Sequence, residues 1–224
     1  FSAPARRAGE AFLIFDHVNA LEQTRKAWQY LPGQRRVKLA PDLSYDTPNP
    51  GVAGMLTYDD AFVFNGALDR YDFKLVGKRE MIVPYNNYKA AYYASREALT
   101  KPNHFDPDLM RWELHRVWVV EATLKPGKRH IYHKRTFYLD EDSWNALASD
   151  EYDARGQLYR GVFSPIAFSY DHQAITTALM VGYDLIGGTY SVQGATSAHW
   201  GVKYRDPYPA REWTPDALAG AGIR

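Results

Sequence analysis

The feature that most constrains the fold is a long alternation of apolar and charged side chains over residues 70–83. A period of two is typical of a β-strand with one buried face. At about 3.3 Å per residue such a strand spans roughly 46 Å. Gly77 lies at its centre, where a glycine usually marks a bulge or a sharp bend. The stretch therefore predicts a strand that wraps around something, with one face formed by Tyr71, Phe73, Leu75, Met81 and Val83.

Turn signals separate the other strand-like segments. Pro32-Gly33 predicts a hairpin, because proline presets φ for the first turn position and glycine accepts a positive φ at the second. Recurring turns without a helical pattern between them indicate an antiparallel meander. We expect irregular segments at 40–54 and 84–107, a helical turn capped by Asp106, and a C-terminal helix capped by Thr214. The predicted strands are 10–18, 26–31, 34–39, 70–83, 112–125, 128–140, 144–152, 157–168, 178–185 and 189–194.

Composition narrows the class of protein. Aromatic residues make up 15% of the chain, and they suit half-buried strands and the walls of amphipathic cavities. The chain has no cysteine, which excludes disulfides, thiolate metal sites and a cysteine nucleophile. A net charge of +1 gives no general case for nucleic acid, and no apolar run is long enough for a membrane helix. We therefore predict one mainly β domain over 1–224: a single highly curved antiparallel sheet whose concave face is covered by short helices or loops.

Motifs for catalysis or metal binding are weak. The sequence has no nucleophile elbow, zinc-protease motif, phosphate loop or dinucleotide fingerprint. His130 and His133 are three apart, so on a strand they point to opposite faces, whereas Glu113 and His115 share a face but lack a third ligand. We predict no catalytic residue, no metal site and no cofactor.

Charged clusters are interpreted as surface features. The acidic pair Asp59-Asp60 favours loop solvation and capping over acid–base chemistry. Basic residues are dense at 34–38 and 128–135, yet Lys134 and Arg135 alternate across a strand, so the charge does not collect on one face. The pattern predicts a solvated outer face that could meet anionic lipid headgroups.

The distribution of aromatic side chains is the most informative feature for function. On the strand 112–124 one face carries Trp112, Leu114, Trp118, Val120, Ala122 and Leu124. Such residues either fill the core of a sandwich or line a cavity, and alternation alone does not separate the two. From alternation and size we predict that the concave face is lined by Trp28, Tyr30, Tyr71, Phe73, Leu75, Met81, Trp112, Trp118, Phe137 and Trp144.

Four sequence strings resemble a known bacterial family. They are WQYLPGQRRV at 28–37, FNGALDRYDFKLVGK at 64–78, WELHRVWVVEATLKPG at 112–127 and RTFYLDEDSW at 135–144. The chain is similar to domain-of-unknown-function family 1329 from about residue 10 to its end. Family members are about twice as long and begin with a signal peptide, so the resemblance implies the C-terminal half of a longer exported protein.

The resemblance also implies a location and a fold. It places the chain in the periplasm of Gram-negative bacteria and relates it to the outer-membrane lipoprotein-sorting (Lol carrier) superfamily. Members of that superfamily form an open, curved half-barrel whose concave face holds acyl chains. Genes of the family often accompany resistance-nodulation-division exporters with an outer-membrane partner, which implies a hydrophobic cargo.

Three functions follow as hypotheses. The first is a periplasmic carrier or adaptor for lipid, lipoprotein or another hydrophobic cargo. The alternative is a structural subunit of an envelope complex that docks a partner on the same sheet and binds no ligand. The third is a hydrolase or other enzyme acting on hydrophobic substrates. A resemblance to a carrier family predicts the fold of the chain, but it does not identify the ligand.

Overall fold

The computed structural model describes residues 5–19, 22–195 and 202–221. The chain is mainly β and divides into two compact units. Unit 1 contains Phe1–Thr47, Ala67–Asp69 and Arg205–Arg224, and unit 2 contains Pro48–Gly66 and Arg70–Tyr204. The expected mainly β fold, with one large antiparallel sheet that is not closed into a barrel, is confirmed. Organisation as a single domain stays a prediction.

Unit 1 is a small antiparallel sheet with a helix packed on it. Strands β1 (Ala11–Phe15), β2 (Lys26–Leu31) and β3 (Arg36–Leu39) pair in that order, and α2 (Pro215–Ala221) contacts all three. Thr214 caps α2 as predicted, because its hydroxyl accepts from the amide of Ala217 at 3.1 Å. The predicted hairpin at Pro32-Gly33 is present, but Arg35 and not Gly33 adopts the positive φ, at 48°.

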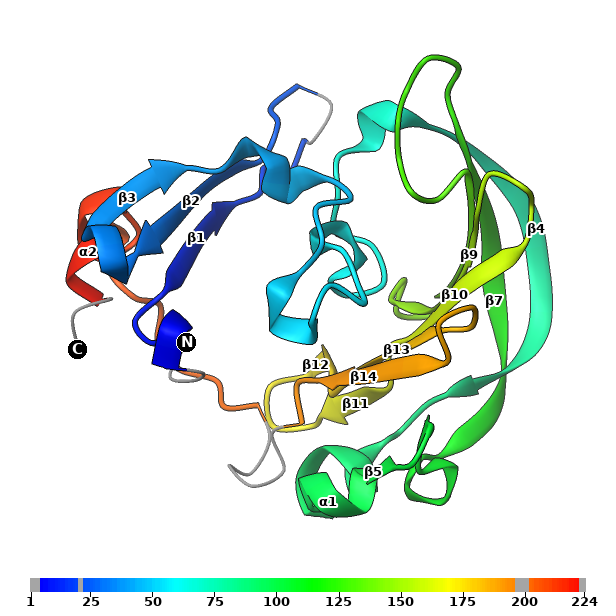
Figure 1. Ribbon diagram of the computed structural model, residues 1–224. Helices are drawn as coiled ribbons and strands as arrows, with labels where there is room; N and C mark the ends of the chain where they lie inside the picture. Colours follow the sequence, from blue (N-terminus) through cyan, green and yellow to red (C-terminus); the bar gives the residue numbers. More distant parts are fainter. Residues whose placement is uncertain (1–4, 20–21, 196–201, 222–224) are drawn as a thin grey trace. The chain divides into compact units, whose positions relative to one another are not determined.

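Unit 2 is built on seven antiparallel strands in the order β14-β13-β10-β9-β8-β7-β4. Figure 1 shows them curving as one layer from β4 to β14. The strands β4 and β7 are much longer than the others, and their length lets them follow the curve of the sheet. Their bounds are β4 (Tyr71–Pro84), β7 (Trp112–Leu124), β8 (Lys134–Asp140), β9 (Ala146–Tyr152), β10 (Leu158–Phe163), β13 (Met180–Asp184) and β14 (Thr189–Gln193).

A register shift interrupts β4 at the predicted place. Leu75 pairs with Val120 and Gly77 with Val119, so Val76 is the extra residue of a β-bulge. Gly77 has φ 143°, a region where side chains other than glycine's are strained. Because a slip of one residue exchanges the two faces, even-numbered residues replace odd-numbered ones on a given face after the bulge.

The inner side of the curve carries the segment 48–66, which we call the inner cover (Figure 1). It has two short 3-10 turns, Pro50–Val52 and Tyr58–Asp60. Leu56 and Val63 of this segment are fully buried, and they pack against the sheet residues Tyr71, Ala122, Phe137, Val162 and Met180. We call the sheet face that holds these residues the inner face.

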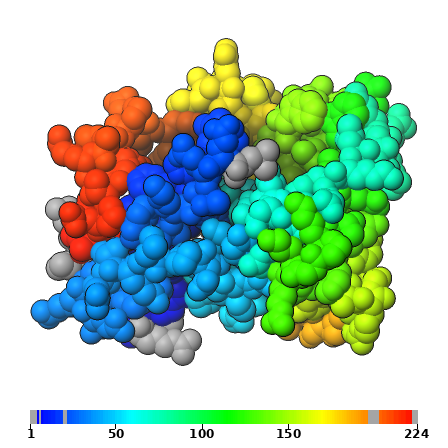
Figure 2. Space-filling view, turned by 90° about the horizontal axis from the view of Figure 1, so that it is seen from above, coloured from blue at the N-terminus to red at the C-terminus, as the bar shows by residue number. Residues whose placement is uncertain are grey.

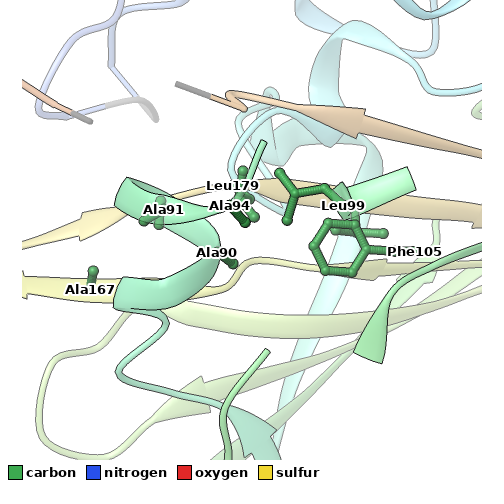
Figure 3. Close-up of a cluster of buried hydrophobic side chains, with 9 residues drawn as sticks. Ala90, Ala91, Ala94, Leu99, Phe105, Ala167 and Leu179 are labelled. Atoms are coloured by element: carbon green, nitrogen blue, oxygen red, sulfur yellow. The ribbon is translucent and has the colours of Figure 1, made fainter. Parts of the chain in front are cut away.

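The opposite, outer face is covered by residues 85–110 and by a hairpin. Inside that segment lie a π-helical turn (Lys89–Tyr93), α1 (Arg96–Leu99), the strands β5 (Thr100–Lys101) and β6 (His104–Phe105), and a 3-10 turn (Pro107–Leu109). Alanines at the centre of the cluster let the turn approach the sheet closely (Figure 3). The hairpin consists of β11 (Ile166–Ser169) and β12 (Ala174–Thr177).

Several element boundaries differ from the predictions. The segment 84–107, which was expected to be irregular, contains short helices. They form because alanines of this segment, and not its tyrosines, make up the face that packs in the core. The predicted strand 157–168 is two strands, and β12 follows it unpredicted. The predicted strand 128–140 begins only at Lys134. The cap at Asp106 is confirmed, since its carboxylate accepts from the amide of Asp108 at 3.1 Å.

Candidate functional site: the inner face of the curved sheet

The centre of the inner face is a buried ionic cluster around Arg135, whose side chain is completely buried. Its guanidinium donates to Asp59 at 3.1 Å and to Asp60 at 2.9 Å, and both carboxylates belong to the inner cover. On the sheet side it donates to Glu151 at 3.0 Å, with a second ion-pair contact of 2.7 Å. It also donates to the carbonyl of Val63 at 3.1 Å. One residue of β8 thus fastens the inner cover to the sheet.

Neighbouring side chains complete this cluster. The backbone amide of Tyr132 donates to Nδ1 of His130 at 3.0 Å, so Nε2 of that ring carries the proton that is donated to Asp59 at 2.8 Å. The hydroxyl of Tyr132 donates to Asp60 at 2.9 Å and accepts from Arg160 at 2.9 Å. In Figure 2 the loop that follows β7 lies against the inner cover, in agreement with these contacts.

Burial and charge move the pKa values of the cluster in different directions. Burial raises the pKa of Asp59, but the hydrogen bond from His130 and the charge of Arg135 outweigh it and hold this pKa at about 2. Burial raises the pKa of Glu151 to about 8, because the attraction of Arg135 offsets it only in part and Asp60 adds repulsion. Burial also raises the pKa of Asp60. The cluster therefore keeps a proton at a pH where carboxyl groups are ordinarily ionised.

Two sequence predictions are wrong at this cluster. Arg135 is not on a solvated outer face, and Asp59 and Asp60 are not solvated by water, although Asp60 does form a capping box with Thr57. A signal was present in the sequence: Arg135 is two residues before Phe137, which was predicted to face inward, and residues two apart on a strand share a face. Its partners Asp59 and Asp60 are more than seventy positions away, so local pattern did not reveal them.

The β4 and β7 part of the inner face is apolar and open. Ile82 and Leu114 pair with each other across the two strands and expose 65% and 67% of their surface. Leu75 is also exposed, and the rings of Trp118 and Trp144 stack at 6.0 Å with an angle of 17°. We call these five residues the open apolar strip. The register places Glu80 and Arg116 opposite each other on the same face, between Trp118 and the Ile82–Leu114 pair, so the strip consists of two apolar groups separated by charged side chains. Exposed apolar surface of this kind is a mark of an interaction site.

Charged side chains also lie on this face, between the members of the strip. The ammonium of Lys78 lies 4.4 Å from the ring centre of Trp118 and 2.6 Å from the carboxylate of Glu141, which also accepts from Arg116 at 2.7 Å. The strip therefore combines exposed apolar side chains with cationic and anionic groups, a mixed composition that suits an amphipathic molecule.

The other end of the inner face holds a pocket of about 230 Å³ between the inner cover and the last strands. Phe62 and Met180 are among its walls, and the lining is predominantly apolar. Phe62 and Val63 have φ values of 55° and 75°. A β-branched residue at positive φ is strained, and the contacts of the inner cover keep it there.

Most of the predicted lining residues do lie on the inner face. Register places Tyr71, Phe73, Leu75, Trp118 and Phe137 there, and Trp144 joins them through its stacking on Trp118. Tyr71 and Phe137 are buried in the core beneath the inner cover, whereas Phe73, Leu75 and Trp144 are exposed.

The remaining predicted residues lie elsewhere. Met81 is on the outer face, because the bulge at Val76 reverses the alternation, and it packs beside Val83 and Val117. By register Trp112, the first residue of β7, shares the face of Leu114, but its ring makes an edge contact with Phe163, which belongs to the outer face. Trp28 and Tyr30 belong to unit 1, where Tyr30 is part of the core. Whether any of the ten residues binds a ligand stays a prediction.

The histidines form no metal centre within the residues that the structure describes. Glu113 and His115 share a face as predicted, and Nε2 of the histidine lies 3.0 Å from the carboxylate. The imidazole stacks on Tyr85 with ring centres 3.8 Å apart. Over the same described part of the chain, no helix is long and apolar enough to cross a membrane.

Comparison with known proteins agrees with the geometry. The model of the family described as "Protein of unknown function (DUF1329)" matches residues 1–219. The chain belongs to this family. It is 44% identical over 226 residues to the uncharacterized protein PA3922 of Pseudomonas aeruginosa, a match that covers 100% of this chain and 50% of that protein. The chain thus spans half the length of the curated relative that it matches.

Two solved structures share the fold. A DUF1329 family protein from Desulfovibrio piger is 20% identical with a TM-score of 0.62, and the match covers 97% of this chain and 74% of that one. A domain from Vibrio parahaemolyticus assigned to the outer membrane lipoprotein-sorting proteins is 16% identical with a TM-score of 0.61, and the match covers 98% of this chain and 75% of that one. The chain therefore shares the fold of these two structures.

Proposed function

We propose that this chain is the ligand-binding part of a periplasmic carrier or adaptor for acyl-chain cargo, either a lipid or a lipoprotein. The observation that carries the proposal is the open apolar strip on the inner face of a lipoprotein-sorting fold. Membership of the family and likeness to a sorting domain from a Gram-negative envelope support the location.

The dimensions of the strip suit an acyl chain. Leu75 and Ile82 are seven residues apart on β4, which corresponds to roughly 23 Å at about 3.3 Å per residue. The hydrocarbon core of a bilayer is about 30 Å thick and two acyl chains deep, so one chain extends over about half of that. A single chain is therefore short enough to lie along the strip, where it would pass the paired side chains of Lys78 and Glu141 between Leu75 and Ile82.

The energetics suit reversible binding. Burial of roughly 15 methylene groups at ~0.8 kcal/mol each stabilises a complex by about 12 kcal/mol before other terms. Lost translational freedom and ordering of side chains remove a large part of this. The remainder corresponds to an intermediate affinity, which a carrier that must release its cargo requires.

The first test is to extract lipid from natively purified protein and analyse the extract by mass spectrometry. Co-purified acyl lipid supports the proposal. Protein that is free of lipid and that binds no added fatty acid overturns it. Recovery of a stoichiometric envelope protein with no lipid would favour the docking subunit, and recovery of an exporter component would support the predicted link to export.

The second test locates the site. A brominated fatty acid should quench the fluorescence of Trp118 and Trp144, and replacing both with Phe should remove most of that quenching. Leu114→Glu should weaken binding at least tenfold without unfolding, because its side chain is 67% exposed. Ile186→Glu is the matched control: this residue is also exposed, but it lies in the turn after β13. Equal effects of the two variants would contradict the proposed site.

A further inference from the structure

The segment 85–110, which we call the outer cover, presents tyrosines on the side opposite to its alanines. In the turn Lys89–Tyr93, Ala90 and Ala91 are buried against the sheet (Figure 3), whereas Tyr92 is half-exposed and Tyr93 is 78% exposed. π-helical turns occur frequently at functional sites. The turn thus has one face that packs closely and one that displays aromatic rings.

A hydrogen-bonded anchor makes this display rigid. The hydroxyl of Tyr88 donates to the carbonyl of Phe168 at 2.8 Å and accepts from its amide at 3.2 Å. The ring of Tyr88 is nearly parallel to those of Tyr92 and Tyr170, with interplanar angles of 21° and 15° and centre distances of 6.3 and 6.2 Å. Tyr170 exposes 70% of its surface. Rigid amphipathic rings bind at a low cost in conformational entropy.

A second aromatic pair faces the same groove. The rings of His172 and Tyr204 stack at 4.1 Å with an angle of 17°. Together with the tyrosines they line a groove of about 580 Å³, to which Ser169, Asp171 and Lys203 add polar groups. We call it the tyrosine groove. Its lining mixes flat apolar rings with hydroxyl, carboxylate and ammonium groups.

The chemistry of this lining selects one class of ligand. An acyl chain would leave the polar groups without partners, and such groups are costly to desolvate. Asp171 and Lys203 have opposite charges, so the groove does not favour a polyanion. The carboxylate of Asp171 accepts and the ammonium of Lys203 donates, so a ligand with hydroxyl groups, which do both, can satisfy the two, whereas a proline-rich segment lacks N–H groups at its prolines. A sugar ring has apolar C–H faces that lie flat on aromatic rings and hydroxyl donors around its edge.

We propose that the tyrosine groove binds an uncharged saccharide chain, at a site separate from the open apolar strip. The saccharide can be a free glycan or the sugar headgroup of a lipid, because the shared chemistry is the hexose ring. This inference does not depend on acyl binding at the inner face.

The test is to titrate the protein with maltohexaose and with chitohexaose and to measure binding by calorimetry and by the NMR signals of the backbone amides. We expect dissociation constants of about 1 mM or tighter and shifts at residues 88–93 and 168–172. Tyr170→Ala and Tyr93→Ala should weaken binding at least tenfold without unfolding, since both side chains are exposed. Tyr170→Phe should retain most of the affinity that the ring supplies.

Control variants separate saccharide binding at the groove from fatty acid binding at the strip. Tyr208→Ala removes an exposed tyrosine of unit 1 and should not change saccharide binding. Trp144→Ala should weaken fatty acid binding alone, and Tyr170→Ala should weaken saccharide binding alone. Absence of saccharide binding in protein that still binds fatty acid overturns this proposal and leaves the first one standing.

A second experiment distinguishes the two sources of the saccharide. Vesicles of phosphatidylcholine with and without a glucosyl lipid should differ in binding if the headgroup is the ligand, whereas free maltohexaose alone should bind if the ligand is a glycan. Binding of a polyproline peptide without either saccharide would overturn the proposal in favour of a peptide site.

Discussion

The two covers of the seven-stranded sheet both pack apolar side chains on it, and they differ in the part that charged groups play. The inner cover, 48–66, is fastened by a buried ionic cluster that joins Asp59 and Asp60 to Arg135. The outer cover, 85–110, is fastened by alanines and by Leu99 and Phe105, which pack against the hairpin and β13. Both segments are largely irregular, and both are closely packed.

The difference has a physical consequence. Apolar packing depends on the fit of volumes and hardly at all on pH. A cluster of buried charges is stable only while every charge keeps its partner, and its free energy changes with protonation. The inner cover is therefore the part of unit 2 whose attachment responds to pH and to the loss of one charged group.

The largest effect is expected from Arg135→Met. The change leaves buried carboxylates without a cation, and breaking a buried ion pair in this way costs about 3–5 kcal/mol. Urea denaturation should show a loss of unfolding free energy of this size, and hydrogen exchange should show the inner cover opening first. Arg116→Met, which removes an exposed partner of Glu141, should leave both measurements unchanged. A small effect for Arg135→Met would mean that the cluster does not hold the cover.

Leu99→Ala tests the outer cover. Leu99 is fully buried, so the cavity should lower the unfolding free energy by about 2–5 kcal/mol. Leu56→Ala is the matched change in the inner cover, because Leu56 is also fully buried. The loss for Leu99→Ala should be equal at pH 5 and pH 8. A pH-dependent loss at Leu99 would break the distinction between the two covers.

A smaller change is expected from pH alone. The folded pKa of Glu151 is about 8, above its ordinary value of 4.5, so the stability it contributes is complete below pH 4.5 and is lost as the pH rises toward 8. The raised pKa of Asp60 acts in the same direction. Asp59, with a pKa of about 2 against an ordinary 3.8, contributes above pH 3.8 and loses its contribution only as the pH falls toward 2. Stability should therefore fall between about pH 5 and pH 8.

The variant Glu151→Gln should flatten this pH profile, because the amide does not titrate. The measurement is the midpoint of urea unfolding at several pH values between 5 and 8. A profile in the variant that is as steep as in the parent protein would assign the pH dependence to another group.

The smallest effect is expected from Gly182→Ala. The added Cβ would lie 2.8 Å from a methyl of Leu56, so that side chain would have to move. The expected loss of unfolding free energy is about 1 kcal/mol, at the low end for overpacking, because the end of a leucine side chain can rotate. Gly161→Ala on the neighbouring strand meets nothing within 4 Å and should be close to neutral. Equal costs for the two variants would show that the inner cover is not in close contact with β13.

Much of the sheet could be predicted from local pattern. The alternation of β7 correctly placed Leu114, Trp118 and Val120 on one face, because no bulge interrupts that strand. The same argument on β4 failed beyond Gly77. The glycine indicated a bulge, but an extra residue exchanges the faces, and so Met81 was assigned to the wrong one.

The candidate site was only half predictable. Large apolar residues on an inward-facing strand indicate the open apolar strip, and the sequence identified Leu75, Trp118 and Trp144. The tyrosine groove was not predicted, because it brings together Tyr88, Tyr170 and Tyr204 from three distant segments. Nothing in the spacing of those residues indicates that they meet.

By itself the sequence determined the long strands, their turns and the bend at Gly77, because period and turn chemistry depend on neighbours a few residues apart. Only the tertiary structure decided what covers each face. Arg135 could be buried only because Asp59, Asp60 and Glu151 contact it there. A charged side chain that faces the core is very costly to bury unless partners of opposite charge surround it, and the local sequence does not specify those partners.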